Sequence, residues 1–148
     1  NIDDDLLHNG NLTIITNSLP VLNELRSEKG VHLIFLGGIY VPDYEVVVGP
    51  RTINHLRSLY VDKMFLGTDG LTFSQGITTA NVLEAEVSQE MVKIAKEIIV
   101  VSDSTKIGQK GLASMGSITE INKLITDKNA PEDFVKRLQE HGVKVVLV

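Results

Sequence analysis

The chain has 148 residues, of which 43% are hydrophobic, 22% charged and 5% aromatic. This composition excludes intrinsic disorder, collagen-like repeats and aromatic-rich nucleic-acid platforms, and it suits one globular domain with its own core. Fourteen Lys and Arg against nineteen Asp and Glu give a net charge of −5 with no basic block, so this chain alone is predicted to repel DNA phosphates.

Cysteine is absent, which excludes disulfides, thiolate catalysis and cysteine-based metal sites and is compatible with a reducing cytosol. No apolar run approaches the roughly 20 residues that span a bilayer. The opening residues Asn1–Asp5 show no signal-peptide pattern, and the absence of an initial Met hints at a fragment or a processed chain. We therefore expect a cytoplasmic chain that does not act at a membrane.

Short Val-, Ile- and Leu-rich runs alternate along the chain with helix-period segments, a pattern typical of a mostly parallel sheet covered by helices. The first such unit is predicted as a strand at Leu12–Thr16, a helix from Ser18 to about Arg26 and a strand at Val31–Leu36. Leu22 and Leu25 are expected to face the core from this helix.

The segment from Gly37 to Gly49 clusters Val and Tyr and is interrupted by Pro42, so it predicts a turn, a short extended piece and a second strand rather than a helix. A helix is then expected from Pro50 to about Ser58, with Ile53 and Leu56 facing inward.

The clearest predicted helix lies between the strands Lys63–Gly67 and Ile98–Ser102. Asn81 followed three residues later by Glu84 matches a capping box at its start. An apolar stripe then follows at i, i+4, i+8 and i+11. Its members are Leu83, Val87, Met91 and Ile94.

A second helix is predicted between the strands Lys123–Thr126 and Val143–Val148. Pro131 and the two acidic residues after it suit a first turn, and Gly142 suits a left-handed cap at the end. The inward pair of this helix is Phe134 and Leu138. Together, these elements predict one compact α/β domain over residues 1–148, with a mostly parallel open sheet covered by helices.

Small or polar residues follow almost every predicted strand. The carboxyl ends of parallel strands gather at one edge of a sheet, where ligands bind, and glycines there let a backbone approach an anion closely. Ordinary turns also use Gly, Ser and Asp, so the same residues have a purely structural explanation. Asp103 and Lys106 place a carboxylate and an ammonium after one strand, which suits sugar hydroxyls and phosphate, or simply a cap and a solvated charge.

Several functional classes lack their motifs. No G-x-G-x-x-G follows a predicted strand and no Walker A sequence occurs, so the usual nucleotide phosphate loops are absent. His8, His32, His55 and His141 lie far apart and in no metal-binding spacing, and no metal or cofactor is expected. The run Asp3–Asp5 could ligate a cation, but a solvated terminus is the commoner explanation.

Seven segments share their order and spacing with a known family: Leu12-Thr-Ile-Ile-Thr-Asn-Ser18, Leu36-Gly-Gly38, Val48-Gly49, Asp62-Lys-Met-Phe-Leu-Gly-Thr-Asp-Gly70, Gly76-Ile-Thr-Thr79, Asp103-Ser-Thr-Lys106 and Lys123-Leu-Ile-Thr-Asp127. In this arrangement, residues 11–148 resemble the C-terminal effector-sensing domain of DeoR-family bacterial transcriptional regulators.

The resemblance implies a sugar-phosphate sensor, usually a repressor of carbohydrate genes, on the fold shared by ribose-5-phosphate isomerase and CoA transferases. It implies no catalysis, a homo-oligomer, and operator DNA contacted only through a winged helix-turn-helix domain that is not in this chain. Asp103 would accept hydrogen bonds from sugar hydroxyls, and Lys106 would counter negative charge. The pocket would be lined by Thr16, Asn17, Gly37, Gly38, Gly67, Asp69 and Gly70, with Thr78 and Thr79 as hydroxyl donors.

The segment Gly70–Thr79 is long for a strand-to-helix connection, where about 2 to 6 residues is usual, and it is expected to be a mobile lid that orders over the ligand. The competing hypothesis is a sugar-phosphate isomerase on the same fold, which needs a general base near the substrate carbon. Asp69 or Glu84 would serve as that base.

Two features depart from the family pattern. The Asp-x-Gly-Ser/Thr-Thr loop expected to hold phosphate has no match before Asn11, which favours a truncated chain in which Ile2–Leu7 is the tail of a helix, since a lost strand would expose a sheet edge. Ser88 stands where family members commonly carry Lys, so a ligand role for that position is not expected.

Overall fold

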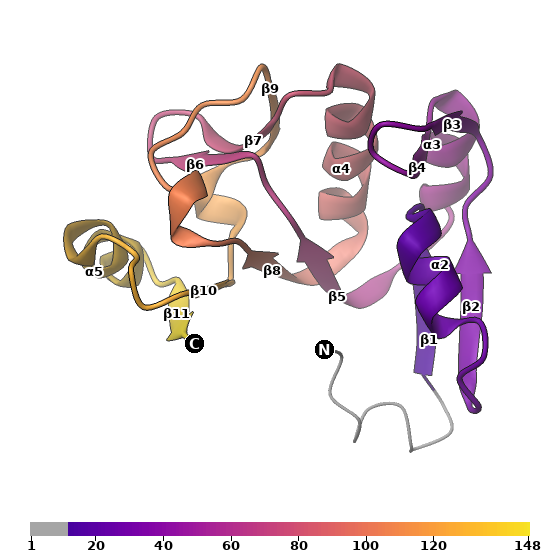
Figure 1. Cartoon of the computed structure of the whole chain (residues 1–148), viewed down its shortest axis with the longest axis horizontal. Helices are drawn as coiled ribbons and strands as arrows, with labels where there is room; N and C mark the ends of the chain where they lie inside the picture. The colour runs from indigo at the N-terminus through magenta and orange to yellow at the C-terminus, as the bar shows by residue number, and fades with distance from the viewer. Residues whose placement is uncertain (1–11) are drawn as a thin grey trace. The chain divides into compact units, whose positions relative to one another are not determined.

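The computed structural model describes residues 12–148, which form an α/β fold (Figure 1). The chain divides into two compact units, one ending at His55 and the other comprising Leu56–Val148. The predicted helix tail at Ile2–Leu7 and the acidic run Asp3–Asp5 lie outside the described residues. One domain over residues 1–148 stays a prediction.

The first unit starts with a β-α-β motif. Strands β1 (Leu12–Thr16) and β2 (Val31–Phe35) pair in parallel, and helix α2 (Leu19–Leu25) forms the crossover between them. Leu25 is buried and Leu22 is partly buried, so both predicted core positions of this helix are confirmed. The strand and helix boundaries differ from the predictions by a residue at most.

An antiparallel hairpin and a helix complete the first unit. Strands β3 (Ile39–Val41) and β4 (Val46–Val48) pair in the hairpin, which confirms the turn and two extended pieces predicted there. Helix α3 (Pro50–Leu56) follows, and the buried Thr52 hydroxyl donates to the Gly37 carbonyl at 2.8 Å. This hydrogen bond ties the turn after β2 to α3.

The second unit is built on a parallel sheet with the strand order β11-β10-β8-β5 (Figure 1). Each of these strands was predicted from a short, mainly apolar run in the sequence, although Phe65 of β5 and Val101 of β8 are exposed in this structure. Their bounds are β5 Val61–Leu66, β8 Ala95–Val101, β10 Lys123–Thr126 and β11 Lys144–Leu147.

A second, antiparallel sheet was not predicted from the sequence. It consists of β6 (Gly70–Thr72), β7 (Gly76–Thr79) and β9 (Ala113–Gly116), in the order β6-β7-β9. The lid predicted at Gly70–Thr79 is therefore wrong as a description of the local structure, because this segment is a β-hairpin whose strands are buried. Backbone pairing with β9 holds β7 in place, so neither strand is a free loop.

Helix α4 (Val82–Ile94) starts at Asn81 as predicted, and the Asn81 side chain accepts a hydrogen bond from the Glu84 amide at 3.0 Å. The reciprocal half of the capping box is missing, since Glu84 turns to a different partner. The predicted apolar stripe is confirmed at Val87, which is buried, and at Met91 and Ile94, which are partly buried, but it is wrong at Leu83, which is 43% exposed. The small residues of α4 face the core instead, which lets the helix approach β9 closely.

Helix α5 (Glu132–Glu140) matches its prediction more closely. Pro131 precedes it, Leu138 is fully buried, Phe134 is partly buried, and Gly142 ends the helix with a φ of +84°. Two single-turn 3-10 helices, η1 (Ser104–Lys106) and η2 (Ile118–Glu120), complete this unit. Among the residues that the structure describes, no helix has the length and apolar character needed to cross a bilayer.

Candidate functional site

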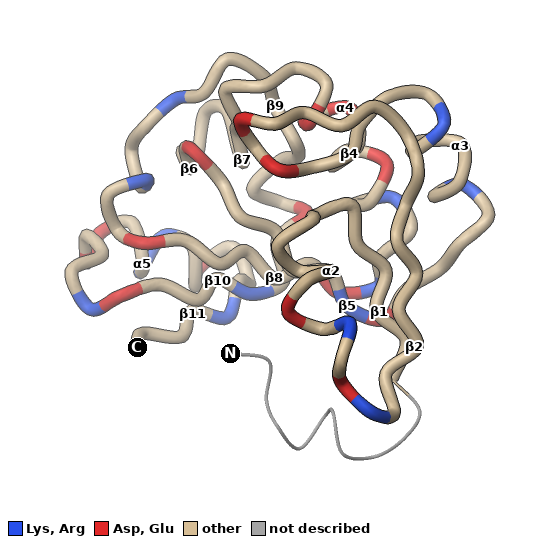
Figure 2. Tube along the Cα trace, turned by 45° about the vertical axis from the view of Figure 1, so that its right-hand side comes forward, with Lys and Arg blue, Asp and Glu red and all other residues tan. Residues whose placement is uncertain are grey.

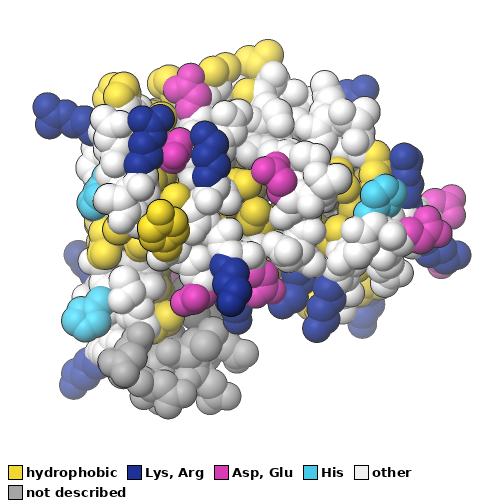
Figure 3. Space-filling model, turned by 180° about the vertical axis from the view of Figure 1, so that it is seen from behind, with side chains coloured by type: hydrophobic (Ala, Val, Ile, Leu, Met, Phe, Trp, Pro, Cys, Tyr) yellow, Lys and Arg dark blue, Asp and Glu magenta, His cyan; other side chains and the backbone are white. Residues whose placement is uncertain are grey.

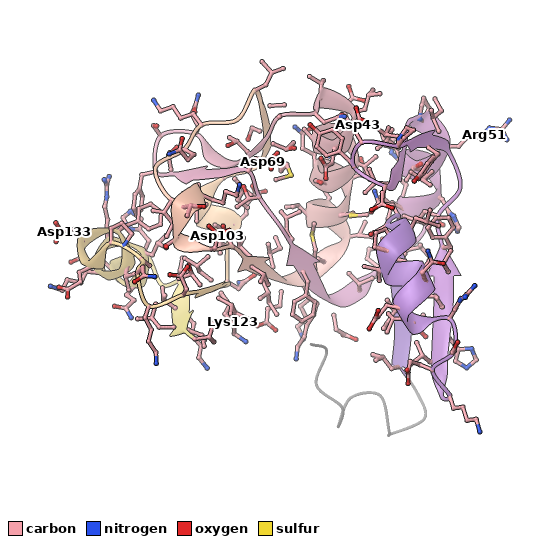
Figure 4. All side chains as sticks on the ribbon, in the orientation of Figure 1. Asp43, Arg51, Asp69, Asp103, Lys123 and Asp133 are labelled. Atoms are coloured by element: carbon pink, nitrogen blue, oxygen red, sulfur yellow. The ribbon has the colours of Figure 1, made fainter. Side chains whose placement is uncertain are left out.

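The polar segments of the second unit follow three neighbouring strands of its parallel sheet. Residues 67–69 follow β5, residues 102–106 follow β8, and Asp127 follows β10. Asp69 and Asp103 are labelled in Figure 4, which shows that they come from two of these segments. The carboxyl ends of adjacent parallel strands thus bring Gly67, Asp69, Asp103 and Lys106 to one edge of the sheet, as expected. The other predicted residues of this unit, Gly70, Thr78 and Thr79, lie in the antiparallel β6–β7 hairpin.

The segment after β8 is held by two carboxylates. Asp103 caps η1 by accepting hydrogen bonds from the amide and the hydroxyl of Thr105. These hydrogen bonds from Thr105, with a smaller effect of the Lys106 charge, lower the pKa of Asp103 below its ordinary value. Asp103 is exposed, and a carboxylate has further lone pairs, so the cap leaves it able to accept hydrogen bonds from a ligand.

Asp127 was not among the predicted site residues, although it organises the same segment. Its Oδ2 accepts the Ser104 amide at 2.6 Å and its Oδ1 accepts the Ser104 hydroxyl at 3.0 Å. Hydrogen bonds from the amides of Ser104 and Asn129 lower the pKa of Asp127. The contact joins positions 23 residues apart, so only the polar residue after a predicted strand could have pointed to it.

Lys106 ends η1 and is partly buried, and it forms no ion pair with the other described residues. Just beyond it, the Gly108 amide donates to the Leu71 carbonyl at 2.9 Å, which ties η1 to the β6–β7 hairpin. The backbone around Lys106 is therefore fixed, while its ammonium remains available for an anion.

Thr78 has a structural role in the hairpin. Its side chain is buried, its hydroxyl donates to the Gly70 carbonyl at 3.0 Å, and its oxygen accepts the Gly111 amide at 2.8 Å. Thr68 adds a hydroxyl 2.7 Å from the same carbonyl and 2.8 Å from the Thr78 carbonyl. Thr78 was predicted as a hydroxyl donor to a ligand, but in this structure its hydrogen-bonding capacity is satisfied by the protein.

Thr79 lies between two carboxylates. Its Oγ1 is 3.0 Å from Asp69 Oδ2 and 3.1 Å from Glu84 Oε2. Asp69 Oδ2 also accepts the Ala80 amide at 3.0 Å. Burial raises the pKa of Glu84, the Thr79 hydroxyl partly offsets this, and the Asp69 charge raises it further. Two acidic residues named for the isomerase hypothesis thus share one hydroxyl.

The first unit contains four more predicted site residues. Thr16 accepts the Ser18 amide at 3.0 Å, and the Asn17 side chain donates to the Val47 carbonyl at 3.0 Å. Both side chains therefore fix the chain after β1. Gly37 and Gly38 come directly after Leu36, just beyond the end of β2, which is the strand-end position predicted for them.

The four strand-end glycines fall into two classes. A Cβ on Gly38 would collide with the Thr52 hydroxyl and the Val48 carbonyl, and one on Gly70 would lie 2.7 Å from Thr78 Oγ1 and closer still to the Gln109 carbonyl. Packing therefore requires glycine at these two positions. A Cβ on Gly37 or Gly67 would meet nothing within 4 Å, so packing gives no reason for glycine there.

Lys and Arg residues are interspersed with Asp and Glu along the trace of the described residues (Figure 2). On the face shown in Figure 3, basic side chains are scattered among acidic ones. No cluster of three or more His, Asp or Glu able to hold a metal ion occurs in the part of the chain that the structure describes.

Comparison with known proteins identifies the family. The family model of the DeoR C terminal sensor domain matches residues 2–128. The chain belongs to this DeoR sensor-domain family. Sequence resemblance had pointed to it, and the α/β architecture with a four-stranded parallel sheet agrees with it.

Several curated relatives are named as transcriptional regulators. The chain is 32% identical over 134 residues to a putative aga operon transcriptional repressor of Escherichia coli O157:H7, covering 90% of this chain and 50% of that protein. It is 30% identical to the HTH-type transcriptional repressor GlcR of Bacillus subtilis (strain 168), covering 91% and 52%. It is 32% identical to the HTH-type transcriptional regulator UlaR of Shigella dysenteriae serotype 1 (strain Sd197), covering 91% and 53%. The chain thus spans about half the length of these relatives.

Proposed function

We propose that the chain is the effector-sensing part of a cytoplasmic DeoR-family transcriptional regulator of carbohydrate metabolism, and that a sugar phosphate binds at the strand ends of the second unit. The observation that carries this proposal is the convergence of polar segments at the carboxyl ends of β5, β8 and β10. Lys106 supplies a cation without an ion-pair partner among the described residues, and Gly67 supplies an open backbone.

Each group in this arrangement has a chemical role. Lys106 binds the phosphate as a compact charge, and the Gly67 backbone lets the ligand approach the sheet edge. The exposed Asp103 accepts hydrogen bonds from sugar hydroxyls, for which charge-assisted bonds are the strong ones. One relative is named as a putative aga operon transcriptional repressor and another, of Haemophilus influenzae, as an L-fucose operon activator, and these names support a regulator linked to carbohydrate genes.

In this proposal, binding of the sugar phosphate is coupled to DNA binding. A ligand shifts a two-state equilibrium only by binding one state more tightly, so the sugar phosphate would favour one arrangement of a homo-oligomer over another. Operator DNA would be contacted by a domain outside these 148 residues, because their net charge is −5 and no basic block occurs in them.

Isothermal titration calorimetry with a panel of sugar phosphates and the corresponding unphosphorylated sugars tests the proposal. We expect saturable binding of at least one phosphorylated sugar and a large loss of affinity for the same sugar without phosphate. Equal affinity for the two forms, or no binding across the panel, would contradict it.

A second candidate function is sugar-phosphate isomerisation, and one observation favours it. Glu84 has a raised pKa and shares the Thr79 hydroxyl with Asp69, and a carboxyl of raised pKa suits a general base. A coupled isomerase assay with the same panel separates the two functions, since turnover that is lost in Glu84→Gln would establish an enzyme.

A further inference from the structure

The two carboxyl groups next to the Thr79 hydroxyl can both form hydrogen bonds with it only if one of them carries a proton. A threonine hydroxyl carries one hydrogen, yet its oxygen lies 3.0 Å from Asp69 Oδ2 and 3.1 Å from Glu84 Oε2. If both carboxyl groups are ionised, one of these contacts is a hydrogen bond and the other places two oxygen acceptors against each other. A proton on one carboxyl group turns both contacts into hydrogen bonds.

The neighbouring hydrogen bonds show which carboxyl group holds that proton. Asp69 Oδ2 accepts both the Thr79 hydroxyl and the Ala80 amide, so this oxygen acts as an acceptor in both of its contacts. Glu84 is partly buried at the start of α4 and Thr79 is its one hydrogen-bonding side chain among the described residues. The donor order is therefore from Glu84 to Thr79 to Asp69.

We propose that Glu84, Thr79 and Asp69 form a proton-dependent clasp, in which a proton on Glu84 joins the first turn of α4 to the end of β7 and to the segment after β5. These are segments that frame the strand-end edge of the second unit. Loss of the proton leaves two carboxylates facing one hydroxyl, so the clasp weakens as the pH rises.

Other charged groups around Glu84 do not replace this proton. The strands that pack on α4 are β7 and β9, which carry no titratable side chains, and β5 and β8, whose charged residues lie at their starts. Lys106 of η1 and Lys110, in the segment packed against Thr79, form no ion pair with Glu84 or Asp69 among the described residues. The charge that acts on Glu84 is that of Asp69, which favours the protonated form.

The sign of the resulting pH dependence is fixed. Glu84 has a raised pKa in the folded chain, so the folded chain binds this proton more tightly than the unfolded chain does. Its stabilising contribution is complete below the unfolded-state pKa and is lost as the pH rises through the folded-state value. If the sugar phosphate of the proposed function binds at this edge, its affinity will follow the same proton.

The test uses the ligand-free 148-residue chain, so it does not depend on the proposed function. Carboxyl ¹³C chemical shifts are followed by NMR from about pH 3 to 8, a range that covers ordinary carboxyl groups. We expect one glutamate to titrate above the ordinary glutamic acid range, to vanish in Glu84→Gln, and to remain in the control Glu86→Gln, an exposed position on the same helix. An ordinary or lowered titration of Glu84 would overturn the proposal.

A second variant keeps the test decisive if Glu84→Gln folds poorly. Asp69→Asn removes the charge that favours protonation, so the titration of Glu84 should move to lower pH. In thermal unfolding, the stability of the wild-type chain should fall as the pH rises through the Glu84 titration. Glu84→Gln keeps a donor for Thr79, so its stability should show no such fall. An unchanged Glu84 titration in Asp69→Asn, or the same pH dependence of stability in Glu84→Gln, would contradict the clasp.

Discussion

The two sides of the candidate site differ in how much of their polar chemistry the protein itself uses. On the hairpin side, Thr78 and Thr79 are each 2% exposed, and their hydroxyls bond to the backbone or to acidic neighbours. On the side of η1, Asp103 is exposed and Lys106 forms no ion pair with a described residue. Polar residues predicted for one site thus hold the framework together on one side and remain available for a ligand on the other.

This difference predicts that substitutions on the hairpin side will change stability and those on the η1 side will change affinity. The largest effect on stability is expected for Gly70→Ala, because the new Cβ would overlap the Gln109 carbonyl and crowd Thr78 Oγ1. Overpacking of this kind costs about 1–3 kcal/mol of unfolding free energy. Urea unfolding of the variant measures it, and wild-type stability would show that the hairpin is not rigid here.

The largest effect on affinity is expected for Lys106→Ala. The variant removes the cation proposed to hold the phosphate, and a hydrogen bond to a charged group contributes roughly 1.5–3 kcal/mol, about 10- to 150-fold in affinity. The melting temperature should change little, since Lys106 has no ion pair among the described residues. Calorimetry compares it with the control Lys136→Ala on α5, whose affinity should equal that of the wild type.

Asp103→Asn should have a smaller effect on affinity. The amide oxygen of asparagine can still accept from Thr105, so η1 keeps its cap, but its hydrogen bonds to sugar hydroxyls lose the help of the charge. We expect a loss on the order of tenfold for the sugar phosphate. Unchanged affinity in calorimetry would show that Asp103 only caps the turn.

The parallel strands could be predicted from the sequence because each contains a short apolar run, as strands of a helix-covered parallel sheet do, although Phe65 of β5 and Val101 of β8 are exposed here. The bounds of β1 and β10 agree with their predictions. The antiparallel sheet left no such signal: β7 reads Gly-Ile-Thr-Thr, and its partner β9 lies more than thirty residues later, with Thr78 opposite Ser114. A short polar strand paired at long range looks like a loop in sequence.

The site was predictable to the same degree. Asp103 lies next to the residues that it caps, so local sequence placed it after a strand. The role of Asp127 depends on Ser104, which is 23 residues away. The contact of the Glu84 side chain with Thr79 replaces only the second half of the capping box that the sequence suggested, since Asn81 still accepts the Glu84 amide. The sequence could not predict hydrogen-bond partners that tertiary packing brings together from distant positions in the chain.

The smallest effect on stability is expected for Gly67→Ala. This substitution also tests most directly the difference between framework residues and residues available for a ligand. The substitution is the same as at Gly70, only three residues away, but the new Cβ at Gly67 meets nothing within 4 Å and the backbone there needs no positive φ. Stability should stay within about 0.5 kcal/mol of wild type. If a sugar phosphate lies against this open backbone, the added methyl group displaces it, and affinity falls without loss of stability. Calorimetry and urea unfolding on the same sample separate the effect on affinity from the effect on stability. Wild-type affinity would mean that the ligand does not approach the end of β5. Marked destabilisation would mean that Gly67, like Gly70, belongs to the framework.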